Sequence, residues 1–190
     1  MAGALHFAAI LRNLERNTAE VERLVSELIA LSTRCNFTVW LAGGKIFGGW
    51  ARSVSGSTAE GIAWIEDGIR DYRAAGSMLR MPYYLALKAE ALYLANRTPE
   101  ALEAINEAEA VVERFEERGS CAELHRLRGV FLTAIDAVGT QIAASFCAAI
   151  RTGREQKSIS LVKRAEATYA EYHRQKASAL GGNEVRLPLC

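Results

Sequence analysis

The sequence predicts an all-α protein built as a superhelix of about four helix hairpins and one capping helix. One observation behind this prediction is a motif that recurs three times, 40 residues apart: Asn17-Thr18-Ala19-Glu20, Ser57-Thr58-Ala59-Glu60 and Arg97-Thr98-Pro99-Glu100. The other is that apolar residues recur at the helical spacing i, i+3, i+4 and i+7 between the turns. A fixed repeat of this size is typical of units that bury their apolar faces by stacking on their neighbours.

The recurring motif has the composition of a helix N-terminus. Its Thr can cap free N–H groups of the first turn, Pro99 fits that turn, and its Glu favours the positive end of the helix dipole. In the middle copy, Ser57 and Glu60 are also spaced as a capping box. We therefore expect a helix to begin at each copy.

Four hairpins and a last helix account for residues 1–180, which we interpret as one helical repeat domain. The predicted helix pairs cover residues 3–34, 37–75, 82–117 and 120–151, followed by a capping helix at 158–180 and a flexible tail at 181–190. The last helix has one apolar face and is polar elsewhere, as expected at the end of a stack, where one side meets water.

The helix predicted from Trp40 to Val54 is rich in glycine, with Gly43, Gly44, Gly48 and Gly49. An interior Gly costs a helix about 1 kcal/mol relative to Ala, so close approach of a neighbouring helix is expected as compensation. Gly44 and Gly48 are four residues apart and belong to one face. A phosphate-binding loop at Gly43-Gly44-Lys45 is disfavoured, because the glycine spacing is wrong and no Ser or Thr follows the Lys.

Charge and hydropathy argue against two classes of partner. The net charge is +1, from 23 Lys and Arg against 22 Asp and Glu, which gives no electrostatic case for nucleic acid or an anionic membrane. The longest apolar runs are shorter than the ~20 residues of a membrane span. The N-terminus lacks the basic start of a signal peptide, so we expect a cytoplasmic protein.

The four cysteines have no CxxC spacing, and no disulfide is expected. Cys35, Cys121 and Cys147 are predicted to be small apolar core residues, and Cys190 is a candidate for a free, exposed thiol. Cys121 and His125 are one helical turn apart, but no second pair completes a metal site. We therefore expect no metal and no cofactor.

Small residues coincide when the copies are superimposed. Gly49, Ala89 and Gly129 share a position in the first helix of a hairpin, and Gly61 and Ala101 share one in the second. Small side chains there would let the two helices of a hairpin cross closely. The pattern resembles the tetratricopeptide (TPR) repeat, and so implies a right-handed α-α superhelix, a TPR-like solenoid, here stretched to about 40 residues per repeat. It departs from that repeat because most copies here have no Trp at their start.

About residues 4 to 180 resemble the C-terminal repeat region of large bacterial signalling proteins. Those proteins combine a class III adenylate or guanylate cyclase domain, an ATPase domain and TPR repeats. The resemblance rests on Trp40-Leu41-Ala42 through Gly49-Trp50-Ala51, Ala59-Glu60-Gly61-Ile62-Ala63, Pro82-Tyr83-Tyr84-Leu85-Ala86 and Ala122-Glu123-Leu124-His125-Arg126-Leu127. It implies a regulatory module. Neither the metal-binding aspartates of the cyclase nor the phosphate loop of the ATPase has a counterpart, so no catalytic residue is implied.

The leading hypothesis is a non-catalytic protein–protein interaction scaffold. Stacked hairpins offer a concave surface lined by their first helices, where aromatic and Arg side chains are the usual anchors. By repeat position the predicted partner-binding residues are His6, Asn13, Ile46, Trp50, Ser53, Tyr83, Glu90, Tyr93 and Arg126. The alternative for Trp50 and the tyrosines is that they fill the core.

The sequence leaves other functions open. A small-molecule or peptide sensor that controls a nucleotide cyclase or ATPase is the main alternative, because the inferred inner face mixes aromatic and polar groups. Enzyme activity is disfavoured, because His6, His125 and His173 are far apart in sequence and form no catalytic set. An acidic sixth helix and a basic segment at 151–176 also allow self-association.

Overall fold

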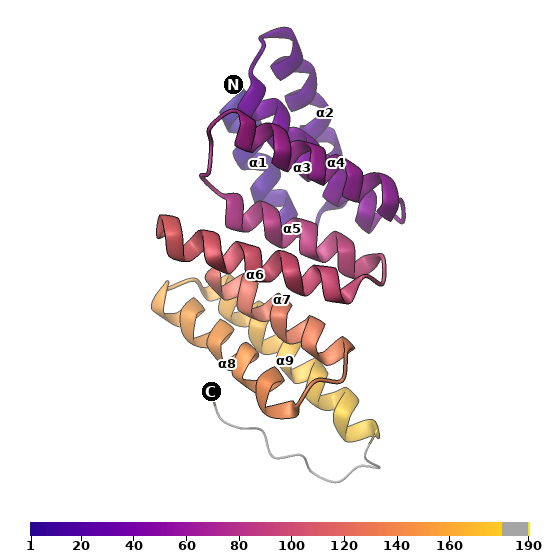
Figure 1. Cartoon of the computed structure of the whole chain (residues 1–190), viewed down its shortest axis with the longest axis vertical. Coiled ribbons are helices and arrows are strands. Elements are labelled where there is room, and N and C mark those ends of the chain that lie inside the picture. Colours follow the sequence, from indigo (N-terminus) through magenta and orange to yellow (C-terminus); the bar gives the residue numbers. More distant parts are fainter. Residues whose placement is uncertain (180–189) are drawn as a thin grey trace. The chain divides into compact units, whose positions relative to one another are not determined.

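A computed structural model describes residues 1–179 and residue 190, and shows nine helices and no strand in that part of the chain (Figure 1). The helices are α1 (Ala2–Leu14), α2 (Thr18–Arg34), α3 (Thr38–Val54), α4 (Thr58–Ala74), α5 (Met81–Leu94), α6 (Thr98–Phe115), α7 (Cys121–Ala134), α8 (Gly139–Glu155) and α9 (Ile159–Ala179). The predicted all-α helical repeat solenoid is confirmed. The predicted tail at 181–190 lies outside the described residues, apart from Cys190.

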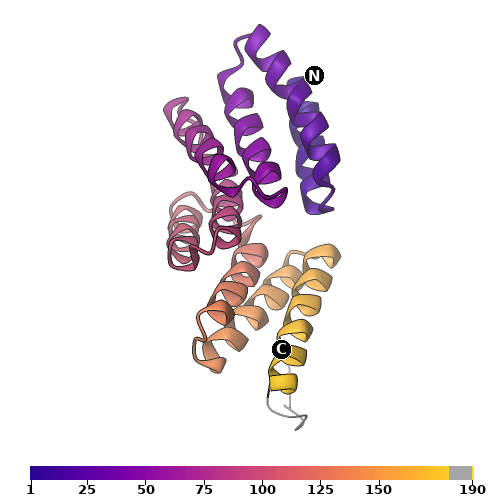
Figure 2. The same ribbon diagram turned by 90° about the vertical axis from the view of Figure 1, so that its right-hand side faces the viewer.

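The chain divides into two compact units, Met1–Ala104 (unit 1) and Ile105–Cys190 (unit 2). In unit 1, helices pack on their neighbours in chain order, and α3 contacts α1, α2, α4 and α5. Figure 2 shows these helices as antiparallel neighbours. In unit 2, α7, α8 and α9 all contact one another. Among the described residues, no helix has both the length and the apolar character needed to cross a membrane.

Left-handed residues mark the turns between helices at a regular spacing. Seven of them follow one another every 20 residues, and the eighth comes 21 residues after the seventh: Arg16, Asn36, Gly56, Gly76, Asn96, Glu116, Asp136 and Lys157. A residue in this conformation just after a helix allows the chain to reverse. The structural period is thus a helix and its turn, half of the 40-residue repeat in the sequence.

The recurring motif begins α2, α4 and α6 as predicted, but its Thr is the first helical residue and not the cap. In α2 the cap is Asn17, whose Oδ1 accepts a hydrogen bond from the backbone N–H of Glu20 at 3.2 Å. The predicted capping box is wrong, because Ser57 makes no side-chain cap hydrogen bond. Glu60 instead pairs with Arg52, at 3.1 Å.

Glycines allow α3 and α4 to cross closely. A Cβ atom on Gly49 would lie 2.5 Å from the carbonyl oxygen of Gly61, and one on Gly68 would lie 2.8 Å from that of Ala42. The other predicted glycine face is also confirmed, because Gly44 and Gly48 both face α2. The backbones therefore approach where the sequence places its small residues.

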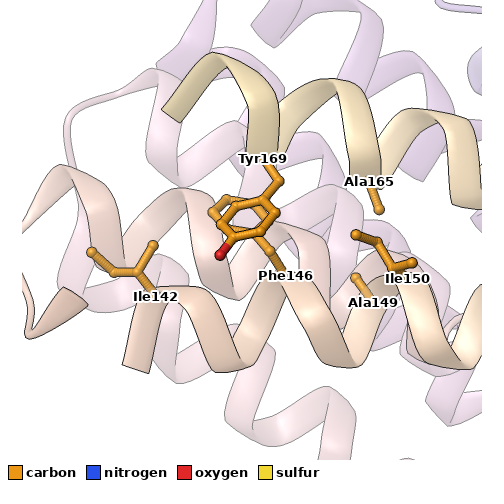
Figure 3. Packing of buried hydrophobic residues seen from close by; sticks show 6 residues of the cluster. All are labelled: Ile142, Phe146, Ala149, Ile150, Ala165 and Tyr169. Atoms are coloured by element: carbon orange, nitrogen blue, oxygen red, sulfur yellow. The ribbon is translucent and has the colours of Figure 1, made fainter. Parts of the chain in front are cut away.

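The core of unit 2 lies between α8 and α9, and Figure 3 shows six of its residues: Ile142, Phe146, Ala149, Ile150, Ala165 and Tyr169. The rings of Phe146 and Tyr169 are stacked, with centroids 5.1 Å apart. Gly129 of α7 lies under the Phe146 ring, since a Cβ atom there would be 2.8 Å from Cε1 of the phenyl ring. The predicted pairing of a small residue with a large one is thus present in this unit too.

The expectations for the cysteines are largely wrong. Cys147 and Cys190 form a disulfide, so Cys190 is not a free thiol and Cys147 is not simply a core residue. Cys35 is exposed, because it is the C-cap of α2 and lies at a turn. Cys121 is half-buried.

A methyl group at Gly61 tests the close crossing of α3 and α4. In Gly61→Ala the new Cβ meets Ser53 and the carbonyl oxygen of Gly49, and backbone cannot give way as a side chain can. We expect a loss of about 3 kcal/mol or more in the free energy of unfolding by urea. The control is Gly3→Ala, whose Cβ would lie 3.4 Å from the Trp40 ring. That variant should stay within about 0.5 kcal/mol of the parent, and equal losses in both would refute the crossing.

Candidate functional site

The first helices of three consecutive hairpins, α1, α3 and α5, meet in a cluster of aromatic and polar side chains in unit 1. The contacts run from α1 to α3 and from α3 to α5. We call this set the inner cluster, and it consists of His6, Asn13, Phe47, Trp50, Tyr83, Tyr84 and Glu90. It brings together five of the nine predicted partner-binding residues.

Glu90 holds one edge of the inner cluster. The indole Nε1 of Trp50 donates to Oε2 of Glu90 at 2.7 Å, and Nη1 of Arg16 donates to the same oxygen at 2.8 Å. The guanidinium of Arg16 also lies 5.5 Å from the centre of the Trp50 ring. The Glu90 side chain is 13% exposed and that of Arg16 is 43% exposed, so the ion pair lies where the cluster meets solvent. We call Arg16 and Glu90, with half-buried Tyr93, the rim.

Two further hydrogen bonds join α1 to α5 inside the cluster. The hydroxyl of Tyr83 donates to Oδ1 of Asn13 at 2.5 Å, and the hydroxyl of Tyr84 lies 3.1 Å from Nε2 of His6. Gly43 makes room for this contact, because a Cβ atom there would lie 2.7 Å from Cε1 of His6. Within the described residues, Nδ2 of Asn13 and Nδ1 of His6 are buried without a hydrogen-bond partner. Such atoms lower stability, so the cluster is only partly satisfied.

Burial fixes the protonation states in the cluster. Burial, together with a smaller effect of the positive charge of Arg80, lowers the pKa of His6 from 6.5 to about 4. Burial also raises the pKa of Tyr84. At neutral pH both groups are uncharged, as their low-dielectric surroundings favour.

The inner cluster is closed, which corrects the predicted binding surface. Trp50 and Ile46 are fully buried, and the exposed fractions of Ser53 and Tyr83 are 2% and 8%. The prediction that Trp50 presents its ring to a partner is wrong, and the alternative that it fills the core is the one the structure favours. Repeat position alone predicts that this face is open. The neighbouring first helices carry large side chains, and these side chains close it. Of the nine predicted partner-binding residues, only Glu90 and Tyr93 are half-buried.

Arg126, the remaining predicted residue, belongs to unit 2 and is 7% exposed. Its guanidinium makes two 2.8 Å hydrogen bonds to the carboxylate of Glu123, and Arg164 of α9 lies 3.4 Å from the same carboxylate. A buried ion pair of this kind fixes how helices pack and is costly to break. Nη1 of Arg126 also donates to Oγ1 of Thr168 on α9 at 3.4 Å, so this buried residue links α7 to α9.

Sequence reasoning missed a groove of about 500 Å³ in unit 1, lined by α2, α3 and α4. Gly48 and Trp64 line it, and the centre of the Trp64 ring lies 3.6 Å from the guanidinium carbon of Arg52, another lining residue. The other lining residues are Glu22, Val25, Ser26, Ile29, Ser55, Ser57 and Glu60. No local pattern in the sequence marks this groove, because its lining comes from three helices together.

Among the described residues, no group of three or more His, Cys, Asp or Glu side chains is placed to hold a metal ion. His125 lies 4.0 Å from Glu109 on α6, and burial lowers the pKa of this histidine. Arg128 also pairs with Glu109, its Nη2 lying 2.7 Å from Oε2 of the carboxylate, so this carboxylate is already held by a cation.

Comparison with known proteins gives one similarity. No family model matches the chain, and no solved structure matches it. The chain is similar to an uncharacterized protein, R02095, of Rhizobium meliloti (strain 1021), with 31% identity over 129 residues. The match covers 66% of this chain and 12% of the relative. The chain thus corresponds to a small part of that much longer protein.

The lowered pKa of His6 predicts that stability falls as the pH is lowered. Between pH 6.5 and about 4, the unfolded chain binds a proton at His6 that the folded chain does not. The free energy of unfolding should therefore fall by about 3 kcal/mol over this interval. Urea unfolding of the parent and of His6→Gln at pH 7.5, 6, 5 and 4.5 measures it.

The variant is needed because the pKa values of His125 and His173 are also lowered. These two residues contribute equally to both proteins, so the difference between the two curves reports His6 alone. His6→Gln should show a shallower decline than the parent. Parallel curves for the two proteins would show that His6 titrates normally in the folded state.

Proposed function

We propose that the chain is a non-catalytic protein–protein interaction module of TPR type that regulates a larger bacterial signalling protein. Its support is the stack of helix hairpins in unit 1, whose first helices share one face. Repeat stacks of this kind are extended binding surfaces more often than catalytic centres. The bacterial relative, in which the similar segment is 12% of the length, supports a role as one part of a longer protein.

The observation that carries the proposal is the charged rim beside an apolar core. Glu90 accepts hydrogen bonds from Trp50 and Arg16, and both partners anchor its carboxylate at the surface. Polar and charged groups that stay accessible to solvent usually form the rim of a protein-binding site. The partner we propose is a protein or peptide that brings opposite charges to Arg16 and Glu90.

Arg16→Asn tests the rim without disturbing the turn. Arg16 has a φ of 62°, and Asn already occupies the equivalent turn positions 36 and 96. We expect the folded state to stay within about 1 kcal/mol of the parent, because an exposed ion pair contributes little. Proximity labelling in the native host should recover a partner with the parent chain and lose it with the variant.

The matched control is Lys157→Asn, which makes the same exchange at the left-handed turn before α9. It should recover the same partner as the parent. If Arg16→Asn and the parent label the same proteins to the same extent, the rim does not bind the partner.

A second candidate function is the sensor, and the groove over Gly48 is the observation that favours it. A groove of about 500 Å³ falls within the size range of small-molecule sites. Arg52, held between Trp64 and Glu60, supplies hydrogen-bond donors for an anionic group of a ligand.

A thermal-shift screen with small carboxylates and phosphates tests this second function. A true ligand at 100 times its Kd should stabilise the folded chain by about 2.7 kcal/mol. Arg52→Gln should abolish the shift. A ligand whose shift survives in that variant binds elsewhere.

A further inference from the structure

One position of the 40-residue repeat carries a paired cation in two copies and a glycine in the copy that lines the groove. It is Gly48 on α3, Lys88 on α5 and Arg128 on α7. The ammonium of Lys88 lies 3.0 Å from the carboxylate of Glu66 on α4. The guanidinium of Arg128 lies 2.7 Å from that of Glu109 on α6. In both later copies a cation of the first helix therefore pairs with a carboxylate of the second helix before it.

The first copy has a carboxylate at this interval but not its cation. Glu22 of α2 lines the groove, and its Oε1 accepts a hydrogen bond from Oγ of Ser55 at 3.4 Å. Within the described residues no Lys, Arg or His pairs with Glu22. The positively charged residue of the groove lining is Arg52, and it pairs with Glu60 of α4 at 3.1 Å. Glu22 thus gives the groove a negative charge that the described chain does not balance.

Arg52 supplies a second charged point, some distance from the first. Its Nη1 donates to the carbonyl oxygen of Gly48 at 3.3 Å, and its Nη2 makes no hydrogen bond within the described residues. Gly48 and Ser55, which contact the two charged groups, are seven residues apart on α3. This spacing is about 10 Å along a helix axis. A ligand that reaches both groups therefore has a cation at one end and an anion at the other.

We infer that the groove binds a free basic amino acid, with its side-chain cation on Glu22 and its carboxylate on Arg52. The inference rests on the second candidate function, the sensor, and specifies its ligand. In a simple amino acid the ammonium and the carboxylate are bonded to the same carbon, so they are too close to reach both groups. The side-chain cation of lysine or arginine lies several bonds further away, and its methylene groups can pack on Val25 and Ile29 of the lining.

Two pairs of ligands of matched size test the cation. L-Lysine is compared with L-norleucine, and L-arginine with L-citrulline, by ligand-observed NMR titration of the full chain at pH 7.5. We expect the basic member of each pair to bind at least about tenfold more tightly, because the neutral member leaves Glu22 without a charged partner.

Glu22→Gln connects this preference to the groove. The variant should bind lysine at least about tenfold more weakly than the parent and should bind norleucine as the parent does. The matched control is Glu27→Gln, which removes the same charge from the same helix at a residue outside the groove lining. It should bind lysine as the parent does. Both glutamates are exposed, so both variants should keep the unfolding midpoint of the parent.

The carboxylate end has its own test. Nα-Acetyl-lysinamide keeps the side-chain ammonium but has no carboxylate, as in a lysine within a polypeptide. It should bind the parent at least about tenfold more weakly than lysine does, and Arg52→Gln should bind lysine as weakly as the parent binds the amide. Equal binding of lysine and the amide would overturn the inference, because the ligand would then be a lysine of a protein chain.

The remaining outcomes separate this inference from the functions on which it builds. Equal affinity for lysine and norleucine overturns it, as does full lysine binding by Glu22→Gln or the absence of lysine and arginine binding up to millimolar concentration. If a carboxylate or phosphate still stabilises the parent and not Arg52→Gln, the sensor function stands without this ligand. Arg16→Asn should bind lysine as the parent does, so a failure of the rim leaves the groove unaffected.

Discussion

Unit 1 depends on the near contact of two backbones where Gly49 of α3 meets Gly61 of α4. At this point neither helix has room for a Cβ atom, so the side chains on both sides interlock over the crossing. α3 contacts α1, α2, α4 and α5, so the position of each of these helices depends on this one glycine-rich helix. Its four glycines each cost about 1 kcal/mol in helix propensity, which the packing around them must offset.

The small side chains of α3 also explain why polar groups are buried beside this helix. Over Gly43, the space that a side chain would fill is taken by His6 of α1 and Tyr84 of α5. Their hydrogen bond and the one between Tyr83 and Asn13 join residues 78 and 70 positions apart in the chain. Such bonds form only when α1, α3 and α5 are in one register. Nδ1 of His6 and Nδ2 of Asn13 have no hydrogen-bond partner, but the other polar atoms of these side chains favour one register of the three helices.

The sequence predicted the features that are local or periodic. Helical spacing, the 40-residue repeat and the small residues at Gly49 and Gly61 all act within a few turns, and each was placed correctly. For Trp50 the sequence left partner binding and core filling both open, because repeat position identifies a helix face but not the large side chains of the neighbouring copies that close it. The disulfide of Cys147 with Cys190 gives no local signal, since the two residues are 43 positions apart. The groove gives no local signal either, because residues of α2, α3 and α4 line it together.

Equivalent positions in a repeat differ in function where their surroundings differ. One repeat after Gly48, the same position is Lys88, whose ammonium lies 3.0 Å from the carboxylate of Glu66 on α4. The position that lines the groove as a glycine in one copy is thus a paired lysine in the next. The same reasoning applies to Phe7 and Phe47, which share a position and a side chain but differ in burial. Binding surfaces in this chain are therefore best sought where the repeat symmetry is broken, because a solenoid uses the symmetric positions for its own stacking.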